Sequence, residues 1–160
     1  MILKMKQKGI VSFLVLFFIL GFFYWKKNHE SNKYVVAIEE TSLEVEIANT
    51  PYLRQKGLMG RDHLDEDKGM LFLFITSSIQ TFWMKNTLIP LSIAFIRRDG
   101  TISEILDMEP DSFNGRFKEY VSKEAVPYVL EVNQGWFQSH GIKVNERVHF
   151  SSKIQRILVE

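Results

Sequence analysis

The run GMLFLFI occupies residues 69–75 and has the length of one β-strand. An uninterrupted apolar run of this length is typical of a strand that is covered on both of its faces. The residues just before it, 60–69, are charged and turn-like. We therefore expect residues 69–75 to form a central strand of a β-sheet, with hydrophobic side chains packed on either side.

Further short strands are expected before and after this run. Residues 43–47 alternate apolar and acidic side chains, which is the pattern of a half-buried strand. The clearest hairpin pairs residues 92–97 with residues 101–108 across Asp99-Gly100, a dipeptide suited to the positive φ angles of a tight turn. The remaining expected strands are residues 34–38, 81–85, 120–121, 128–133, 147–150 and 154–159.

Two short helices complete the predicted elements. Thr50 is a candidate cap for a helix over residues 51–56, and Gly57 suits the position after its end. Asn133 is a candidate cap for a second helix through residues 136–137. The chain shows no repeats and no alternation of strands with long helices. The predicted fold class is therefore α+β and mainly β: a single compact, antiparallel, β-barrel-like domain with two short helices packed at its ends.

The composition fits a folded domain, because 46% of the 160 residues are hydrophobic. The chain has no cysteine, which excludes a disulfide scaffold, a Cys-ligated metal and a thiol nucleophile. Five lysines lie in residues 1–30 against one acidic residue, and the rest of the chain is mildly acidic. Its basic residues are scattered rather than gathered in one stripe, so we expect no nucleic-acid partner.

Residues 9–25 carry no charge and are flanked by lysines at both ends. As a helix this segment would be roughly 25 Å long at about 1.5 Å per residue, close to the thickness of a bilayer core of about 30 Å. It predicts one transmembrane helix that anchors the chain in the membrane. The competing interpretation is a cleaved signal peptide, but no small-x-small cleavage site follows the run.

The distribution of lysines around this segment leans toward a cytoplasmic N-terminus. The globular part would then lie on the extracytoplasmic side of the cell membrane, in the periplasm or outside the cell. The expected organisation is an anchor or signal segment over residues 1–27, a polar tether over residues 28–33 and a globular β-rich domain over residues 34–160.

No cofactor or metal site is predicted. The four histidines are widely spaced and form no H-x-x-x-H pair. The acidic run of residues 65–69 differs from a calcium loop, because Gly69 stands at a ligand position and Thr76 stands where a bidentate glutamate is required. The motifs of the standard hydrolases and of phosphate-binding loops are missing as well.

The block FWMKNT, residues 82–87, is the strongest candidate for a binding site. In an alternating strand Trp83 and Lys85 would project together, followed by the amide of Asn86 and the hydroxyl of Thr87. An aromatic plane, a cation and two hydrogen-bonding groups can hold a small polar or anionic ligand. The alternative is that Trp83 belongs to the core and Lys85 is solvated, while Asn86 and Thr87 only form a turn.

Three charged residues elsewhere complete the candidate set of ligand-binding residues, namely Arg54, Arg61 and Glu131. Glu131 stands among valines and a leucine in an expected strand. It is either an outward-facing strand residue or the structural partner of an arginine, or else a general acid or base.

Several of these stretches also occur, in the same order and spacing, in a known family. They are Glu46-Ile47-Ala48, Thr50, Arg54, Gly57-Leu58-Met59-Gly60-Arg61, Gly69-Met70-Leu71-Phe72, Phe74, the block from Phe82 to Leu91, Tyr128-Val129-Leu130-Glu131-Val132 and Gly135. In these features the chain resembles the prokaryotic "domain of unknown function 192" proteins, from about residue 43 to residue 150.

This resemblance implies a single small β-rich domain, often exported or tethered by an N-terminal hydrophobic segment, without an established biochemical activity. The arginines, lysine and asparagine typical of the family correspond to Arg54, Arg61, Lys85 and Asn86. Where members usually have Pro-Leu-Asp, this chain has Ser92 after Pro-Leu. Any role of that carboxylate would therefore be weakened or lost here.

Three functional hypotheses follow. The first is a membrane-anchored binding module for a small polar or anionic ligand of the cell envelope, such as a sugar. The second is an envelope hydrolase or transferase that uses Glu131, Asp99 or Asp107 as a base. The third is a protein-interaction or scaffolding domain in which the motif residues are mostly core and turns. The sequence does not decide whether the chain is an enzyme.

Overall fold

The computed structural model describes residues 33–110 and 118–159. Residues Tyr34–Glu160 form one compact unit. The predicted membrane anchor, residues 9–25, lies outside the described residues. Among the residues that are described, no helix is both long enough and apolar enough to cross a membrane.

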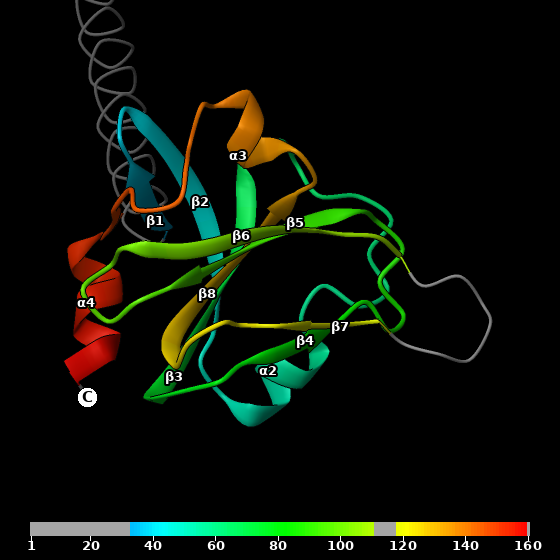
Figure 1. The fold of residues 1–160 in the computed structure, drawn as a ribbon, viewed down its shortest axis with the longest axis horizontal. Coiled ribbons are helices and arrows are strands. Elements are labelled where there is room, and N and C mark those ends of the chain that lie inside the picture. Colours follow the sequence, from blue (N-terminus) through cyan, green and yellow to red (C-terminus); the bar gives the residue numbers. More distant parts are fainter. Residues whose placement is uncertain (1–32, 111–117, 160) are drawn as a thin grey trace, which may run out of the picture. The chain divides into compact units, whose positions relative to one another are not determined.

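The described residues form nine strands and three short helices (Figure 1). The strands are β1 (Tyr34–Ile38), β2 (Thr41–Ala48), β3 (Lys68–Ser78), β4 (Thr81–Trp83), β5 (Leu91–Ile96), β6 (Ile102–Met108), β7 (Glu119–Val121), β8 (Val126–Asn133) and β9 (Val148–Phe150). The helices are α2 (Pro51–Lys56), α3 (Trp136–Ser139) and α4 (Ser152–Val159). The prediction of a mostly β domain with a few short helices is confirmed.

Seven strands form one sheet in the order β6-β5-β8-β3-β2-β1-β9, and β4 pairs with β7 in a separate ribbon. The predicted antiparallel arrangement is wrong for one pair, because β2 and β3 run parallel, with Glu44 opposite Lys68 and Ala48 opposite Phe72. A parallel pair needs a long crossover connection. Here α2 and the loop after it supply that connection.

The sheet curls so that its two ends meet. The start of β6 is bridged to the segment ahead of β9 through Thr101 and Arg147. The amide of Ile102 donates to the carbonyl of Glu146 at 2.8 Å, and that of Val148 donates to the carbonyl of Gly100 at 2.8 Å. These bonds give the sheet its barrel-like form. Gly100 has a φ of 90°, and a Cβ there would lie 2.7 Å from the Val148 carbonyl oxygen, so only glycine fits this closure.

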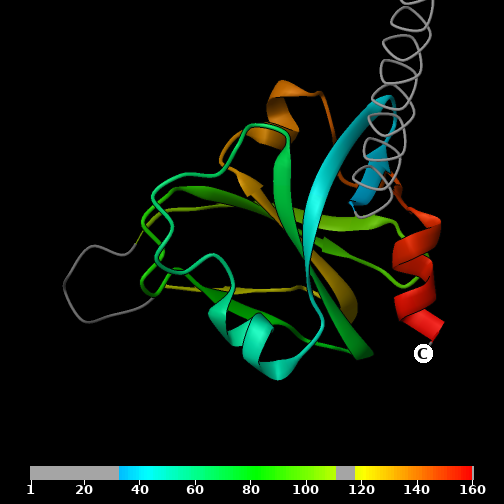
Figure 2. The same ribbon diagram turned by 180° about the vertical axis from the view of Figure 1, so that it is seen from behind.

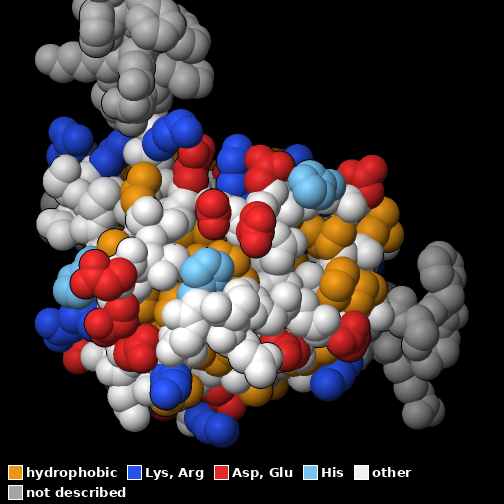
Figure 3. Space-filling view, turned by 90° about the horizontal axis from the view of Figure 1, so that it is seen from above, with side chains coloured by type: hydrophobic (Ala, Val, Ile, Leu, Met, Phe, Trp, Pro, Cys, Tyr) orange, Lys and Arg blue, Asp and Glu red, His pale blue; other side chains and the backbone are white. Residues whose placement is uncertain are grey.

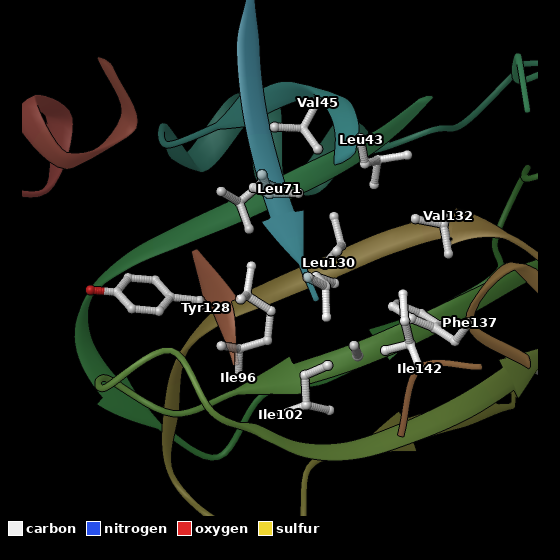
Figure 4. Packing of buried hydrophobic residues seen from close by; sticks show 14 of the residues in the cluster. Leu43, Val45, Leu71, Ile96, Ile102, Tyr128, Leu130, Val132, Phe137 and Ile142 are labelled. Atoms are coloured by element: carbon white, nitrogen blue, oxygen red, sulfur yellow. The ribbon is translucent and has the colours of Figure 1, made fainter. Parts of the chain in front are cut away.

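The first core is the cluster of buried hydrophobic side chains on one face of the sheet. It includes Leu71 of β3 and Leu130 of β8, with Phe137 of α3 and Ile154 of α4 closing it. Figure 4 shows side chains of β2, β3, β5 and β8 converging on this space. The curled sheet thus has a closed, apolar interior.

The second core is the cluster on the opposite face. Met70 and Phe72 of β3 and Val129 of β8 belong to it, and Leu58 and Met84 cover them from outside the sheet. Figures 1 and 2 show α2 and the β4–β7 ribbon on this side and α3 on the other. Residues 69–73 of β3 are therefore covered on both faces, as predicted, whereas the prediction is wrong for Ile75, which is 93% exposed.

Two local predictions are wrong. Residues 154–159 were expected to be a strand and instead belong to α4, because Ile154, Ile157 and Leu158 recur at helical spacing and pack together on the first core. Asn133 does not cap α3, since Gly135 holds that position with a φ of 78°. The amide of Asn133 instead donates to the carbonyls of Leu64 and Asp65, at 2.9 and 3.1 Å.

The surface that carries α3 has a mixed charge. In Figure 3, which looks onto this face, acidic and basic side chains lie interspersed around its edge with hydrophobic side chains between them. Such a distribution differs from the single basic stripe that binds a phosphate backbone.

Candidate functional site

A cavity of about 280 Å³ lies on the face of the sheet that holds the second core. Its walls come from α2 and the residues after it, from β3, from β4, and from single residues of the following turn and of β8. The apolar part of the lining consists of Leu58, Met59, Phe72, Phe74, Phe82 and Trp83, and the polar part of Arg54, Gln55, Lys56, Gln80, Thr81, Thr87 and Glu131. Apolar walls with a few polar groups are typical of ligand sites.

Helix α2 forms where the sequence predicts it. The Thr50 hydroxyl accepts a hydrogen bond from the amide of Leu53 at 3.2 Å, and Pro51 stands in the first turn. The helix ends at Gly57, whose φ is 47° and which lines the cavity against the Phe72 ring. This short, well-capped helix places Arg54 on the cavity wall.

The guanidinium of Arg54 is held firmly by neutral groups. Its Nη1 donates to the carbonyl of Asn49 at 2.8 Å and to that of Leu73 at 2.9 Å. The guanidinium also stacks over the ring of Phe74, 5.0 Å from the ring centroid. No carboxylate among the described residues forms an ion pair with it. A positive charge of fixed position therefore lies beside the cavity without a counterion among the described residues.

Glu131 lies in the middle of the sheet. Strand β8 runs between β3 and β5, and Glu131 stands opposite Met70 on one side and Ile93 on the other. Only 5% of the residue is exposed, and burial raises the pKa of its carboxyl to about 8. Within the described part of the chain no side chain hydrogen bonds to it. Burial therefore favours the neutral, protonated form of this carboxyl group, which lines the cavity.

Residues 82–85 alternate between at least partly buried and exposed side chains, as predicted. Phe82 and Met84 face the second core, and the Phe82 ring meets that of Phe72 edge to face at 4.9 Å. Trp83 and Lys85 are exposed, Trp83 by 45%. However, β4 ends at Trp83, so the chain turns before Lys85, and of these two exposed residues Trp83 lines the cavity and Lys85 does not.

Asn86 and Thr87 form a turn. Asn86 has a φ of 55°, a conformation that asparagine adopts more readily than most residues. Its carbonyl accepts from the amide of Gly60 at 2.8 Å, and the amide of Thr87 donates to the carbonyl of Met84 at 3.0 Å. Asn86 therefore only forms a turn, which was the alternative interpretation of this block. Thr87 belongs to the turn too, but it is also buried and lines the cavity.

Arg61 makes a paired contact away from the cavity lining. Its two terminal nitrogens donate to the two carboxylate oxygens of Glu46 at 2.6 and 2.7 Å. The hydrogen bond from Arg61 lowers the pKa of the Glu46 carboxyl, and the same bond raises the pKa of Arg61. This arginine has its counterion within the fold, unlike Arg54.

The structure therefore divides the candidate residues into two groups. Arg54, Trp83, Thr87 and Glu131 line one cavity, and Arg61, Lys85 and Asn86 are not part of its lining. The lining residues that the sequence did not single out include Phe74, Gln80 and Thr81. Gln80 is buried and donates to the Ser78 hydroxyl and the Val126 carbonyl. Gln80 stands in the largely polar stretch of residues 76–81, and nothing in that stretch marked it as a site residue.

Ser92, which replaces the family's usual aspartate, faces the opposite side of the sheet. Its hydroxyl donates to a carboxylate oxygen of Asp107 at 2.5 Å and accepts from the amide of Gly135 at 2.9 Å. It borders a second cavity of about 410 Å³, together with Asp107, Phe137 and Lys143. A serine at this position therefore affects the hydrogen bonding at the start of α3, and it makes no contribution to the lining of the cavity beside α2.

Metal ligands do not gather around either cavity. In the ranges 33–110 and 118–159, no group of three His, Asp or Glu side chains is placed to hold a metal ion. The polar residues of the site are better suited to hydrogen bonding and to one anionic contact.

The order of the motifs and the fold that they form point to one family. The family model DUF192, described as "Uncharacterized ACR", matches residues 34–150. The chain belongs to the DUF192 family. This confirms the resemblance inferred from the sequence, and the DUF192 match covers every strand and both helices that contribute to the two cavities.

Two crystal structures are similar to this DUF192 chain. One is a "putative transcription regulator" from Sinorhizobium meliloti 1021, 35% identical over 74% of this chain and 92% of that one, with a TM-score of 0.66. The other is a protein of unknown function from Novosphingobium aromaticivorans DSM 12444, 31% identical over 73% of this chain and 83% of that one, with a TM-score of 0.64. The comparison with curated proteins gives no match.

Proposed function

We propose that this DUF192 chain is a binding module whose cavity beside α2 holds a small organic anion. The observation that carries the proposal is the guanidinium of Arg54. Two carbonyls and one aromatic ring fix it in place, yet it has no carboxylate partner among the described residues. A carboxylate or a similar anion would complete its hydrogen bonding.

The contrast with Arg61 supports this assignment. Both arginines are partly buried, but Arg61 already donates two hydrogen bonds, from Nη1 and Nη2, to the carboxylate of Glu46. The hydrogen bonds of Arg54 to described residues all come from Nη1, which leaves Nη2 and Nε to bind a ligand. The aromatic rings that line the cavity would pack against the apolar body of the bound anion.

The place of the domain in the cell is part of the proposal. The uncharged segment of residues 9–25 supports an anchor in the cell membrane, and the flanking lysines favour the domain on the extracytoplasmic side. The ligand would then be an anion of the cell envelope or its surroundings. Alkaline phosphatase and a fluorescent protein, each fused after residue 160, report the side of the C-terminus: phosphatase activity supports the proposed side, and fluorescence alone contradicts it.

One observation favours a second candidate, an envelope hydrolase or transferase. Glu131 has a pKa of about 8 and lines the cavity, so it could exchange a proton near neutral pH. Turnover of an ester or glycoside that is lost in Glu131→Gln would support this activity. Binding without turnover supports the module.

The binding experiment uses the full chain in a mild detergent, with isothermal titration of benzoate, cyclohexanecarboxylate and phosphate. We expect one of the two ring carboxylates to bind, and Arg54→Gln to weaken that binding roughly tenfold or more. Arg61→Gln is the matched control and should bind as the wild type does. The proposal fails if no anion binds, or if Arg54→Gln and Arg61→Gln bind equally well.

Arg54→Gln also removes contacts to two carbonyls, so its fold needs a check. Circular dichroism and thermal melting of each variant provide it. Arg54→Lys keeps the charge but loses the planar donor arrangement, so it should bind with intermediate affinity. Equal binding by Arg54→Lys and Arg54→Gln would mean that the charge plays no part.

A further inference from the structure

The cavity has a second polar group whose chemistry differs from that of Arg54. Glu131 is almost fully buried, has no hydrogen-bond partner among the described side chains and lines the same cavity. The oxygens of this carboxyl are not among the described buried side-chain atoms that lack a hydrogen-bond partner, so they remain open to the cavity. A ligand group in the cavity can therefore bond to this carboxyl.

Strand β3 sets the spacing between the two groups. Arg54 stacks on Phe74, and Glu131 stands opposite Met70. These two positions of β3 face the same side and are four residues apart, so their Cα atoms are separated by roughly 13 Å at about 3.3 Å per residue, which sets the order of magnitude of the spacing. The ring of Phe72 lies between them on the same face. The polar groups therefore lie toward opposite ends of an aromatic floor.

The size of the cavity limits what can bridge this distance. A volume of about 280 Å³ is at the small end for ligand sites. It suits a molecule with one ring, which the faces and edges of Phe72, Phe82 and Trp83 can contact. A six-membered ring with polar groups on opposite carbons, extended at each end by a hydrogen bond of about 2.8 Å, spans a gap of this order.

We propose that the ligand is a small ring carboxylic acid that carries a hydroxyl group on the far side of the ring, with its carboxylate on Arg54 and its hydroxyl on Glu131. This assignment rests on the proposed function and adds the second point of recognition. It makes Glu131 a ligand-binding residue that distinguishes hydroxylated acids from plain ones. The ring itself comes from either an aromatic acid or a sugar acid.

The electrostatic surroundings are consistent with a neutral Glu131. Its cross-strand neighbours Met70 and Ile93 are uncharged, and the only other charged residues in the cavity lining are Arg54 and Lys56 of α2. Burial is what raises the pKa of the Glu131 carboxyl to about 8. At neutral pH this group can both donate a hydrogen bond to the ligand hydroxyl and accept one from it.

The test compares matched probes on the full chain in detergent by isothermal titration. The probes are 4-hydroxybenzoate, benzoate, phenol and D-glucuronate. We expect the wild type to bind 4-hydroxybenzoate or glucuronate roughly tenfold more tightly than benzoate, and to bind phenol weakly because it lacks the carboxylate. Which of the two acids binds more tightly identifies an aromatic or a sugar ring.

Two variants assign this preference to Glu131. Glu131→Gln keeps a donor and an acceptor and should retain the preference for the hydroxylated acid within about threefold. Glu131→Leu has neither, so it should bind 4-hydroxybenzoate and benzoate equally while still binding both. A preference that persists in Glu131→Leu overturns the inference.

The outcomes separate the two proposals. If benzoate binds and depends on Arg54 but the hydroxyl adds no affinity in the wild type, the inference about Glu131 is wrong and the anion-binding function stands. If no carboxylate binds at all, the proposed function itself is wrong. The wild-type comparison alone decides the hydroxyl preference, so the test does not depend on either variant folding.

Discussion

Leu130 and Glu131 are neighbours in β8, yet they face opposite sides of the sheet and very different surroundings. Leu130 is fully buried in the first core, which is closed by α3, α4 and the curl of the sheet. Glu131 faces the side of the second core, where a short helix and a two-stranded ribbon leave a cavity. The same strand therefore serves packing on one face and, in our proposal, recognition on the other.

This difference shows how a small domain can keep both stability and a binding site. A closed apolar core contributes most when it has no gaps. A binding face needs a cavity and polar groups, which cost stability. Placing the two on opposite faces of one sheet lets each face have its own composition, because successive side chains of a strand point to opposite sides.

The largest expected effect is on the free energy of unfolding, and it tests the packing of the first core. Leu130→Ala removes a fully buried side chain from the first core and should lower the free energy of unfolding by about 2–5 kcal/mol. Urea denaturation of the full chain measures it. Folded Leu130→Ala should bind benzoate as the wild type does, since the residue faces away from the cavity. A loss below about 1 kcal/mol would mean that this core is loosely packed.

The second prediction concerns the pH dependence of stability and tests the face of the sheet that carries the cavity. The pKa of Glu131 is raised from 4.5 to about 8 in the folded protein. The folded state therefore keeps a proton that the unfolded chain releases near pH 4.5. The free energy of unfolding should fall as the pH rises from about 4.5 to about 8, with a slope of up to about 1.4 kcal/mol per pH unit from this one group.

Glu131→Leu isolates this contribution. The variant replaces a carboxyl that burial desolvates with an apolar side chain and should be more stable than the wild type at neutral pH by about 1–3 kcal/mol. Its stability should also change less between pH about 4.5 and about 8. Urea titrations at several pH values compare the two proteins. Identical pH profiles would show that Glu131 is ionised and solvated in the folded state.

The smallest change in the free energy of unfolding is expected for a residue outside both cores. Arg61→Ala breaks the ion pair with Glu46, whose two side chains are 33% and 53% exposed. Water and salt screen such pairs, so the loss of unfolding free energy should be about 0–1 kcal/mol and should shrink at high salt. Thermal melting at low and high salt measures it. A loss as large as that of Leu130→Ala would assign Arg61 a structural role that this geometry does not explain.

Much of the fold could be predicted from local sequence. The alternation of β2, the Asp99-Gly100 hairpin and the Thr50 cap of α2 each depend on residues that are close together in the chain. Helix α4 was missed because a short apolar segment such as residues 154–159 fits a strand or a helix equally well. The parallel pairing of β2 with β3 was missed because it depends on where the crossover leads the chain.

The candidate site was predicted less completely. The motif residues Arg61, Lys85 and Asn86 look equivalent to Arg54 in the sequence, but only Arg54 lines the cavity. Phe74 was expected as part of the central strand and was not among the candidate site residues, although it supports the guanidinium of Arg54. Sequence shows which side chains carry chemistry, but not which of them have already been neutralised by a partner inside the fold.

The sequence by itself determined the family, the mostly β class, the central strand over residues 69–75 and the expectation of an anchor over residues 9–25. Hydrophobic periodicity, turn residues and caps act over a few positions, so they are visible in the chain before it folds. Only the tertiary structure decided that Arg54 has no counterion among the described residues and that Glu131 is buried in a cavity rather than exposed. Both properties depend on residues from distant strands and from α2, because a charge is desolvated or paired only by what the fold packs against it.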